Sequence, residues 1–600
     1  MAQIAVDGDY IIVQCDFRQK NIPKSIGGKW DKINKVWYMP LTIYNVNYLC
    51  DKFNVDISNS FQDDIEQQRA KENRLDVIKN AYDKNLSVGL KISGMKQSLY
   101  SFQKLGVAFA LENNDGVLIG DHMGLGKTIQ AIATACYKKH KDKTSECLVI
   151  TPASLKWNWP LEIEKFTNEK YVVIDGSSKN RVDQWLGKYV CRQNDRGNVE
   201  YVESKQKPFF YVVNFALVVE DLFGGKKYTI KKDDTEEQIE RKIKIMEKAQ
   251  DRAKQLKEAR SKNWGCVIID EIHMLKSHKA RRTQEIKKLK SQFRIGLSGT
   301  PLDGRLEELH SVMDFVKPGL FESKYNFLLK HATFDFWGKI TGYKDIATVR
   351  QRIKPFFIRR LKEDVLKELP DKIYENRYVV LSNQEKKIYK QLANREHDLT
   401  KNEEAIVAAI RCKQFCDFPE LAGVSKIKQN SKMQEFLDVV HEIVIVNGQK
   451  VLIFSQYAQM NEIIKKELDK MGIKYYYIWS KTDKKERATI QEKFNNDDSL
   501  DAIIGTDAMS MGLNLTAATY VINYDDAWSP STMSQREDRT HRIKQKNVVT
   551  VVNFVCKDTI EERIRSVLYG KSSLSSKVLG DDTDEVVLRR LGNKEVEKLL

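Results

Sequence analysis

The chain has 600 residues, of which 41% are hydrophobic and 30% are charged, and its formal net charge is +17. This length exceeds what one hydrophobic core supports, so roughly three to five domains are expected. The chain contains no apolar run of the roughly 18 residues that a membrane span needs. The N-terminal MAQIAVDGDY lacks the basic start and apolar core of a secretory signal. We therefore expect an intracellular protein, in the cytoplasm of a bacterial host or in a nucleus, that is neither secreted nor membrane-bound.

The basic balance favours a polyanionic partner, because neutralising phosphate groups releases counterions. A solvated basic surface without any nucleic-acid role is the alternative. The nine cysteines are scattered along the chain. Only Cys412 and Cys416 lie close together, and no second pair or histidine cluster accompanies them at zinc spacing. We interpret them as a helical core pair in a protein of a reducing compartment.

The N-terminal residues 1–60 are expected to form a small β-rich module. It contains Trp30 and Trp37 among several lysines, of which Lys29 is one. Aromatic and basic side chains together are typical of a nucleic-acid surface, which would make Trp30 and Lys29 DNA contacts. A β-module that uses its tryptophans as core is the equal alternative. Residues 61–95 are expected to form a helical linker.

Two long regions alternate short apolar runs with helical stretches. The runs are rich in β-branched residues and end in polar residues, which is typical of strands buried on both faces of a parallel sheet. We therefore predict an α/β fold with two doubly wound parallel-sheet lobes, whose ligands bind beyond the carboxyl ends of the strands. The runs lie at residues 117–119, 147–150, 210–213, 266–269, 294–297, 451–454, 475–478, 502–504, 520–522 and 548–555.

The remaining domain limits follow from these runs and from composition. Residues 226–260 are rich in charged side chains and are expected to form an exposed helical insertion in the first lobe. The expected limits are lobe 1 at 96–320, a mostly helical inter-lobe region at 321–425, lobe 2 at 426–570 and a C-terminal tail at 571–600.

Residues 116–128 (GVLIGDHMGLGKT) predict a phosphate-binding loop, since an apolar strand runs into a glycine-rich turn and then a helix. Glycines let backbone N–H groups approach phosphate oxygens, and the helix N-terminus adds a positive dipole. Lys127 reaches the β- and γ-phosphates and the Thr128 hydroxyl ligates magnesium, so ATP and Mg²⁺ are the expected cofactors. Asp121 stands where the strict pattern has glycine, and Gln103 offers an amide that suits an adenine edge. The expected nucleotide-binding residues are Gln103, Asp121, Gly124, Gly126, Lys127, Thr128, Ile129 and Gly512.

A second acidic motif, Asp270-Glu271-Ile272-His273, follows the apolar run at 266–269. Asp270 is expected to hold magnesium and Glu271 to polarise the attacking water as general base. A capped surface turn with two acidic residues is the alternative. His273 is equally well interpreted as a residue that couples nucleotide state to the next motif or as a polar loop residue.

Phosphoryl transfer also needs positive charge on the leaving phosphate. The second lobe offers Arg539 and Arg542, which lie three residues apart and would share one face if they lie on a helix. Facing the nucleotide, they would act as arginine fingers, and the catalytic set would be Lys127, Asp270, Glu271, Arg539 and Arg542. A merely solvated arginine face is the alternative.

These residues in this order resemble the Swi/Snf-type ATPases of helicase superfamily two, from about residue 99 to about residue 564. The family commonly has aspartate at the position of Asp121, whereas His122 stands where glutamate is usual. The motifs that carry the resemblance are 121–128 (DHMGLGKT), 150–159 (ITPASLKWNW), 270–273 (DEIH), 297–302 (LSGTPL), 357–370 (FIRRLKEDVLKELP), 450–457 (KVLIFSQY), 505–515 (GTDAMSMGLNL) and 535–545 (QREDRTHRIKQ).

The resemblance implies two RecA-like lobes and ATP-driven translocation on double-stranded DNA, usually without strand separation. Residues 22–40 resemble the HARP domain of the annealing-helicase branch, whose members reanneal or remodel forked DNA. The implied partner is double-stranded or forked DNA, bound by a monomer, and the protein partners stay unknown. The DNA contacts implied by matching motifs are Ser154, Lys156, Ser455, Gln456, Thr506 and Asn514.

Two alternatives remain open at this stage. A strand-separating DNA or RNA helicase belongs to the same class, and only the segment at 357–370 argues against it. A nucleotide-gated DNA-binding scaffold with little turnover belongs to another class, and the intact set of expected catalytic residues argues against that.

Overall fold

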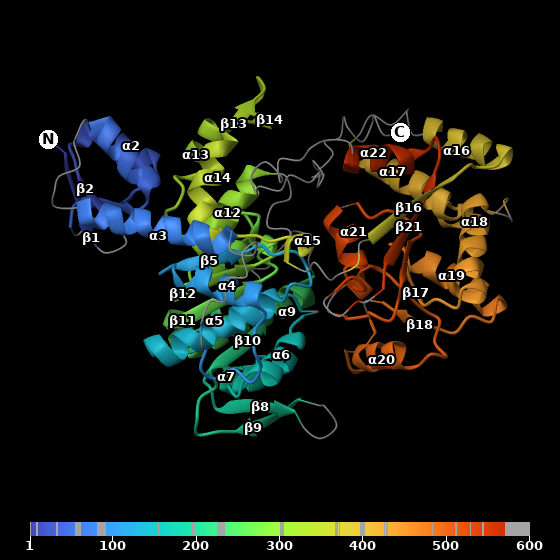
Figure 1. The fold of residues 1–600 in the computed structure, drawn as a ribbon, viewed down its shortest axis with the longest axis horizontal. Coiled ribbons are helices and arrows are strands. Elements are labelled where there is room, and N and C mark those ends of the chain that lie inside the picture. Colours follow the sequence, from blue (N-terminus) through green and yellow to red (C-terminus); the bar gives the residue numbers. More distant parts are fainter. Residues whose placement is uncertain are drawn as a thin grey trace. The chain divides into compact units, whose positions relative to one another are not determined.

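The computed structural model of the chain divides into two compact units (Figure 1). Unit 1 comprises Met1–His122 and Gly126–Val365, and unit 2 comprises Met123–Leu125 and Leu366–Leu600. The structure describes residues 2–569 except for 8–9, 32–33, 54–61, 81–89, 91, 154, 194–198, 225–234, 300–304, 366–369, 371, 396–401, 425–426, 428–429, 480, 483, 511–512, 529, 543–544 and 546.

Unit 1 contains a nine-stranded sheet in the order β15-β5-β12-β11-β6-β10-β7-β8-β9, counted over its described residues. Neighbours from β15 to β7 are parallel, whereas β8 and β9 continue the sheet antiparallel. All five apolar runs expected in this region lie on strands, and β5, β6 and β10 are buried almost throughout, as strands covered on both faces should be. The strands are β5 (Gly116–Ile119), β6 (Cys147–Thr151), β7 (Tyr171–Val173), β8 (Tyr189–Gln193), β9 (Val199–Glu203), β10 (Phe210–Asn214), β11 (Asn263–Asp270), β12 (Lys290–Leu297) and β15 (Phe357–Ile358).

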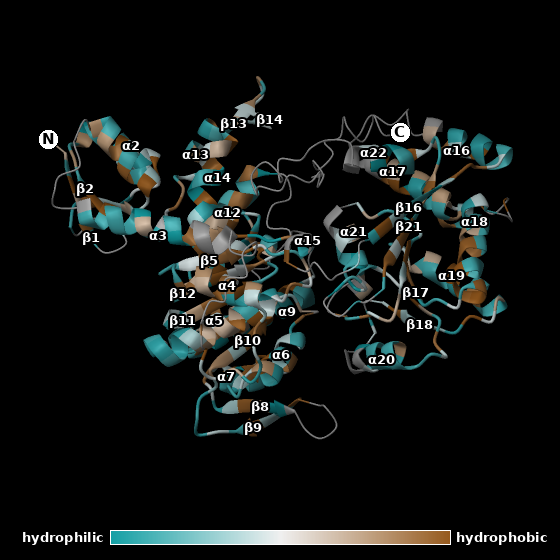
Figure 2. Ribbon diagram, in the orientation of Figure 1, coloured by the Kyte–Doolittle hydropathy of each residue, from teal (hydrophilic) through white to brown (hydrophobic). Residues whose placement is uncertain are grey.

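Unit 2 contains a six-stranded sheet that is parallel throughout its described part, in the order β16-β21-β20-β17-β19-β18. Alternate residues of β17 enter two different apolar clusters, so that both faces of this strand are covered. Figure 2 shows the contrast in hydropathy between such strands and the hydrophilic helix α20. The expected α/β fold with two parallel-sheet lobes is thus confirmed. The strands are β16 (Lys372–Val379), β17 (Val451–Phe454), β18 (Tyr475–Ile478), β19 (Ala502–Gly505), β20 (Tyr520–Asn523) and β21 (Val549–Cys556).

Helices connect the strands of both sheets, as parallel strands require. Those of unit 1 are α1 (Asn21–Ser25), α2 (Ile43–Phe53), α3 (Gln62–Asn80), α4 (Ser101–Leu111), α5 (Lys127–Asp142), α6 (Asn158–Phe166), α7 (Ser178–Trp185), α8 (Phe215–Leu222), α9 (Glu236–Gln255), α10 (Lys257–Ser261), α11 (Arg281–Ile286), α12 (Leu306–Val316), α13 (Lys324–His331), α14 (Ile346–Ile353) and α15 (Lys362–Val365). Those of unit 2 are α16 (Asn383–Arg395), α17 (Asn402–Asp417), α18 (Ser431–Val440), α19 (Ala458–Lys470), α20 (Lys484–Asn496), α21 (Pro530–Glu537) and α22 (Ile560–Tyr569).

The inter-lobe region expected to be mostly helical also contributes a strand to each sheet. β15 pairs with β5 in unit 1, and β16 pairs with β21 in unit 2. Neither strand was predicted from the sequence. β15 has only two residues, and β16 (KIYENRYV) is a half-exposed edge strand that mixes charged and apolar residues. The domain limits expected from the sequence remain a prediction.

The charged insertion contains the helix α9, and its residues 226–234 lie outside the described part. The helix is anchored at its C-terminal end rather than exposed along its whole length. Arg252 on α9 forms ion pairs with Glu220 at 3.0 Å and with the buried Asp221 at 3.1 Å, both of them on α8. Asp221 also binds Arg181. The pairing of buried charges explains why a polar helix packs on the unit at this point.

The N-terminal module is a four-stranded antiparallel sheet with its own small core. The order is β1-β2-β4-β3, and Ile11, Val13, Met39 and Leu49 are fully or almost fully buried in that core. Trp30 is 45% exposed and does not belong to the core, whereas the partly buried Trp37 packs against it. One tryptophan thus fits each of the two interpretations. The strands are β1 (Gln3–Asp7), β2 (Tyr10–Gln14), β3 (Lys29–Asp31) and β4 (Val36–Pro40).

The module docks on the rest of unit 1 through the backbone of residues 25–27. The carbonyl of Ser25 accepts a hydrogen bond from Lys330 at 2.6 Å, and that of Ile26 accepts one from Arg352 at 3.4 Å. Gly27 has φ +90°, and a Cβ added there would come within 2.7 Å of the Gly319 carbonyl oxygen. Docking therefore requires glycine both for its conformation and for its close approach.

Replacing Gly27 with alanine is expected to destabilise the docked module by about 1–3 kcal/mol through strain at positive φ, with a further cost from the backbone clash. Thermal unfolding and limited proteolysis between the module and lobe 1 would measure the loss. Gly176→Ala is the matched control, because Gly176 has φ +84° but no neighbouring atom within 4 Å of its added Cβ. Equal effects of the two variants would contradict the docking role.

Candidate nucleotide site

The carboxyl ends of three neighbouring strands of unit 1 are level with one another. Asp270 on β11 pairs with Leu297 on β12, and Leu297 pairs with Ile119 on β5. The phosphate loop, the segment after β12 and the acidic motif therefore begin at the same edge of the sheet. Ligands of doubly wound sheets bind at this edge.

The turn between β5 and α5 has the backbone of a phosphate loop. Gly124 and Gly126 have φ of +86° and +76°, in the left-handed region that favours glycine. α5 begins at Lys127, and no described side chain caps its N-terminus. A Cβ on Gly126 would lie 2.5 Å from the Gln103 amide nitrogen, so the expected adenine-binding residue lies against the loop. The backbone N–H groups at this helix start suit an anion.

Lys127 lies across the loop that it is expected to serve. Its ammonium donates to the carbonyl oxygens of Asp121 at 2.8 Å and of His122 at 3.5 Å. Thr128 and Ile129 follow in the first turn of α5, where Thr128 is half-buried and Ile129 is buried. The lysine thus already lies over the backbone that a bound phosphate would approach.

Asp121 is fully buried, and its carboxylate accepts hydrogen bonds from side chains of the protein interior. Arg360 donates to both carboxylate oxygens, with its Nε 3.0 Å from Oδ1, and the Gln130 amide donates to Oδ2 at 2.9 Å. Arg360 also donates to Gln130 at 2.7 Å and to the Phe102 carbonyl. Aspartate at this position therefore ties the start of the loop to α4, α5 and the segment after β15. Neither Arg360 nor Gln130 was among the residues predicted from sequence, although Arg360 lies in a motif that carries the family resemblance.

The segment after β15 also binds the loop through its backbone. The N–H of Gly120 donates to the Ile358 carbonyl at 2.8 Å, and that of His122 donates to the Arg360 carbonyl at 2.9 Å. Arg359 donates to the Gly299 carbonyl at 3.1 Å, in the segment after β12. Residues 358–360 thus support both the phosphate loop and the segment after β12 at this edge of the sheet.

Asp270 lies at the end of β11 and accepts two hydrogen bonds on Oδ2. The Trp159 indole donates at 3.0 Å and the Thr151 hydroxyl at 3.1 Å. Burial and the neighbouring Glu271 carboxylate raise the pKa of Asp270 to about 6, while Trp159, Thr151 and Lys127 oppose that rise. The opposing effect of Lys127 indicates that the ammonium of the phosphate loop lies close enough to act on this carboxylate.

Glu271 has a left-handed backbone, with φ 52° and ψ 54°. Such a conformation is strained for any residue other than glycine and is concentrated at functional sites. His273 lies 3.2 Å from the Glu271 carboxylate and 3.1 Å from the Ser298 hydroxyl beyond β12. These contacts favour the interpretation of His273 as the link between the acidic motif and the LSGT segment.

In unit 2 the helix expected to present two arginines on one face ends too early. α21 stops at Glu537, so that Arg539 and Arg542 lie in the turns that follow it. Arg539 donates to the carbonyls of Gln535 at 3.1 Å and Leu513 at 3.2 Å. Arg542 donates to the Asp538 carbonyl at 2.8 Å. Both side chains thus bind a carbonyl at or just beyond the helix end, at Gln535 and Asp538, and Arg539 also binds the separate loop at Leu513.

The neighbouring Arg536, which was not predicted as a site residue, is the fully buried arginine of this motif. It binds the Asp507 carboxylate at 2.7 Å and the Asp525 carbonyl at 2.8 Å. Asp525 in turn accepts from the Ser455 hydroxyl and from the backbone N–H of Gln456 at 3.1 Å. One buried network therefore links the three second-lobe motifs.

The residues expected to contact DNA differ widely in exposure. Lys156 is buried, with its ammonium 2.8 Å from the Asp175 carboxylate, which is the environment of a structural cation. Ser455 is also buried, whereas Asn514 is exposed at a loop. Thr506 is half-buried, and its hydroxyl accepts from the Ala508 N–H at 3.4 Å. Lys29 and Trp30 are exposed on β3 of the N-terminal module, whereas Ser154 and Gly512 lie outside the described residues.

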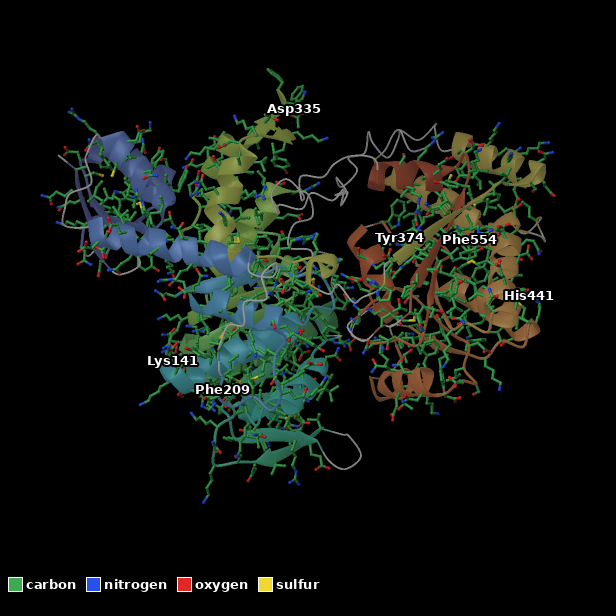
Figure 3. All side chains as sticks on the ribbon, in the orientation of Figure 1. Lys141, Phe209, Asp335, Tyr374, His441 and Phe554 are labelled. Carbon is green, nitrogen blue, oxygen red and sulfur yellow. The ribbon has the colours of Figure 1, made fainter. Side chains whose placement is uncertain are left out.

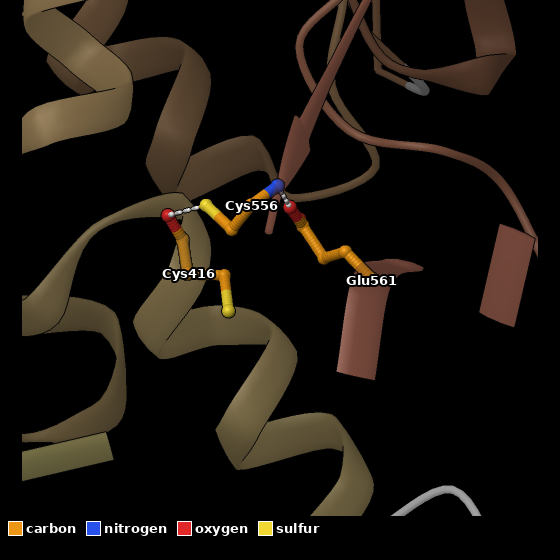
Figure 4. A group of neighbouring side chains, drawn as sticks. All are labelled: Cys416, Cys556 and Glu561. Atoms are coloured by element: carbon orange, nitrogen blue, oxygen red, sulfur yellow. Dashed lines mark hydrogen bonds between the residues drawn. The ribbon is translucent and has the colours of Figure 1, made fainter. Parts of the chain in front are cut away.

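Three buried side chains in unit 2, Cys416, Cys556 and Glu561, have their ligand atoms within 4.8 Å of one another (Figure 4). The Glu561 carboxylate accepts from the buried Lys432 ammonium at 2.6 Å and from the Cys556 N–H at 2.8 Å. A hydrogen bond with Cys416 and burial raise the pKa of the Cys556 thiol well above its usual value. The helical core interpretation of Cys412 and Cys416 agrees with their full burial.

Comparison with known proteins places these motifs in a family. The SNF2-related domain matches residues 100–421 and the helicase conserved C-terminal domain matches residues 431–544. No described helix is both long and apolar enough to cross a membrane.

Several relatives are similar over most of this chain. An uncharacterized ATP-dependent helicase of Mycoplasma pneumoniae is 30% identical over 87% of this chain and 46% of its own length. A putative ATP-dependent helicase/translocase of Bacillus subtilis is 30% identical over 84% and 51%. The rice DNA excision repair protein CSB is 27% identical over 83% and 43%. The chain thus spans about half the length of the relatives it matches.

Among solved structures, the Sulfolobus solfataricus SWI2/SNF2 ATPase core in complex with double-stranded DNA matches with a TM-score of 0.37 and 26% identity. The match covers 85% of this chain and 98% of that one. Since the SNF2-related domain alone matches more than half of the 600 residues, the chain belongs to the SNF2-related family of Swi/Snf-type helicases.

Proposed function

We propose that this protein is a DNA-dependent ATPase that couples ATP hydrolysis to translocation along double-stranded DNA. The observation that carries the proposal is the level edge of the unit 1 sheet, where Lys127, Asp270 and Glu271 follow neighbouring strands. A phosphate-binding loop beside two carboxylates is what hydrolysis of a nucleoside triphosphate needs.

Magnesium fits this donor set. Asp270 and Glu271 are adjacent carboxylates at the end of β11, and burial together with the Glu271 carboxylate raises the pKa of Asp270. Asp270 and the Thr128 hydroxyl are the proposed ligands, since Mg²⁺ prefers oxygen donors together with substrate phosphates. When bound, the ion supplies charge neutralisation at the β- and γ-phosphates. Lys127 holds the γ-phosphate, and Glu271 orients the attacking water as general base.

Arg539 and Arg542 are the proposed second-lobe contribution to the γ-phosphate. Arg539 donates to the carbonyls of Gln535 and Leu513, and Arg542 donates to that of Asp538. A phosphate offers such guanidinium groups a stronger, charged acceptor. Closure of the two lobes around ATP and their relaxation after hydrolysis would then drive movement along a bound strand.

The proposal that DNA is the partner rests on the net charge of the chain and on exposed aromatic and basic side chains. The +17 net charge suits a duplex, and the exposed Trp30 and Lys29 suit the HARP-like role proposed for the N-terminal module. Fork remodelling or strand annealing is the finer proposal that follows from that module. Relatives named as a helicase/translocase and as a DNA excision repair protein support the general class.

ATPase rates measured with no DNA, single-stranded DNA, blunt duplex and forked DNA test the proposal. Duplex and fork are expected to raise the rate well above the DNA-free value, because lobe closure is coupled to the bound strand. A strand-displacement assay on the same substrates should show no unwinding of the blunt duplex. A rate that is the same with and without every DNA would refute the motor function and favour a scaffold.

A further inference from the structure

The hairpin β13–β14 of unit 1 carries two aromatic side chains that the fold leaves in solvent. The strands are β13 (Ala332–Phe334) and β14 (Ile340–Tyr343), and Phe336 and Trp337 occupy the tip between them. Phe336 is 93% exposed and Trp337 is 86% exposed, and their ring centroids lie 5.4 Å apart, edge to face. No apolar neighbour among the described residues recovers the hydrophobic free energy that burying these rings would yield.

The tip is held in one conformation by its own hydrogen bonds. One carboxylate oxygen of Asp335 accepts from the N–H of Trp337 at 3.0 Å and from that of Lys339 at 2.8 Å. The Asp335 N–H donates to the Lys339 carbonyl at 2.9 Å, and Gly338 supplies the left-handed residue with φ +76°. The two rings are therefore presented by a turn that is ordered before any partner arrives.

The base of the hairpin is tied to the helices below it. The N–H of Lys344 donates to the His331 carbonyl at 3.0 Å, and the Tyr343 hydroxyl donates to Glu307 on α12 at 2.8 Å. Figure 1 shows the hairpin extending beyond α13, away from the sheet of unit 1, and Figure 3 labels Asp335 near its end. A stiff, anchored projection keeps the rings clear of the body of the unit.

The surroundings of the tip favour a nucleic acid over a protein partner. Lys339 and Lys344 are exposed on the hairpin, and Arg350 is exposed on the adjacent α14. The hairpin's own acid, Asp335, is already bound to backbone N–H groups, and Asp345 at the base lies 3.5 Å from His331. Two rings on a narrow turn flanked by cations offer too little apolar area for a stable protein interface. They suit stacking against unpaired bases.

We propose that Phe336 and Trp337 form a base-stacking finger that engages DNA bases where a duplex opens into single strands. Unstacked bases are available at such a junction, whereas in an intact duplex they are already stacked on one another. The finger rests on the proposed DNA-directed function and adds a preference for junctions to it. Asp335 acts as the positioning residue that holds the rings in place.

Binding of the full-length double variant Phe336→Ala/Trp337→Ala to forked and to blunt DNA of equal length, without nucleotide, tests the finger. Fork affinity is expected to fall about tenfold or more, because stacking of a base on an aromatic ring contributes at this scale. Blunt-duplex affinity and duplex-stimulated ATPase activity should stay at the wild-type level. Trp337→Phe should keep most of the fork preference, since it retains a ring.

Tyr325→Ala is the matched control, because Tyr325 on α13 is 72% exposed but lies outside the hairpin. Unchanged fork affinity in the double variant would overturn the finger, and so would equal losses on fork and blunt duplex. Failure of the motor proposal shows separately, as a wild-type ATPase rate that no DNA stimulates, because the binding comparison needs no hydrolysis.

Discussion

Lys127→Ala should reduce ATP turnover by at least about a hundredfold to a thousandfold, because one preorganised cationic or hydrogen-bonding group in a phosphoryl-transfer site contributes at this scale. In the structure the ammonium donates to the loop carbonyls of Asp121 and His122. Its loss removes one of the groups that stabilise the buried Asp270 carboxylate, but Trp159 and Thr151 still donate to that carboxylate, so the fold and DNA binding should be kept. Steady-state ATPase assays and duplex binding on the same preparation would measure both.

Lys141→Ala is the matched control for that variant, since Lys141 is exposed near the other end of α5 and donates to the Tyr137 hydroxyl. It should turn over ATP like the wild type. Turnover that survives the loss of Lys127 would remove the phosphate loop from the proposed mechanism.

Arg360→Ala should destabilise unit 1 by about 3–5 kcal/mol, because it leaves the buried Asp121 carboxylate without its counter-charge. The backbone N–H groups of Gly120 and His122 would still bind the segment after β15, but the side-chain tie to α4 and α5 would be lost. We expect a lower unfolding temperature together with a higher KM for ATP. Differential scanning fluorimetry and ATPase titrations would record the two effects.

A double variant tests whether the loss of stability comes from the unpaired buried charge of Asp121. In Arg360→Leu/Asp121→Gly neither charge remains, and residue 121 becomes the glycine of the strict phosphate-loop pattern. The double variant should be more stable than Arg360→Ala, since removing both partners of a buried pair costs less than removing one. Arg350→Ala, at an exposed position on α14, should leave both measurements unchanged. A double variant that is no more stable than Arg360→Ala would contradict the clamp.

Much of the fold could be predicted because strands buried on both faces of a parallel sheet appear in the sequence as continuous apolar runs. Residues 147–150 (CLVI) and 451–454 (VLIF) are continuous apolar runs, and both are fully buried strands. β16 was missed because it is a partly exposed edge strand, whose mixture of polar and apolar residues does not form a continuous apolar run. Local pattern thus recovers central strands better than the edge strands beside them.

Site residues that stand in a local sequence motif could be predicted, whereas contacts between residues far apart in the chain could not. Lys127 and Asp270 stand in local motifs, and both lie at the expected edge of the sheet. The bond between Arg360 and Asp121 joins residues 239 positions apart, and no local spacing reports such a contact. The end of α21 at Glu537 was likewise missed, because the spacing of Arg539 and Arg542 suggests a continued helix, whereas the Arg539 side chain turns back to the Gln535 carbonyl.

The position of Arg360 in the chain has a mechanical consequence. The same short segment that grips the phosphate loop is followed by α15 and then by β16, the first strand of unit 2. Along the covalent chain, a pull exerted by unit 2 reaches the residues behind the ATP-binding loop before it reaches any other strand of the first sheet. If the protein is the motor proposed above, a force that opposes translocation would act directly on the nucleotide site. We then expect nucleotide affinity to change with the opposing force.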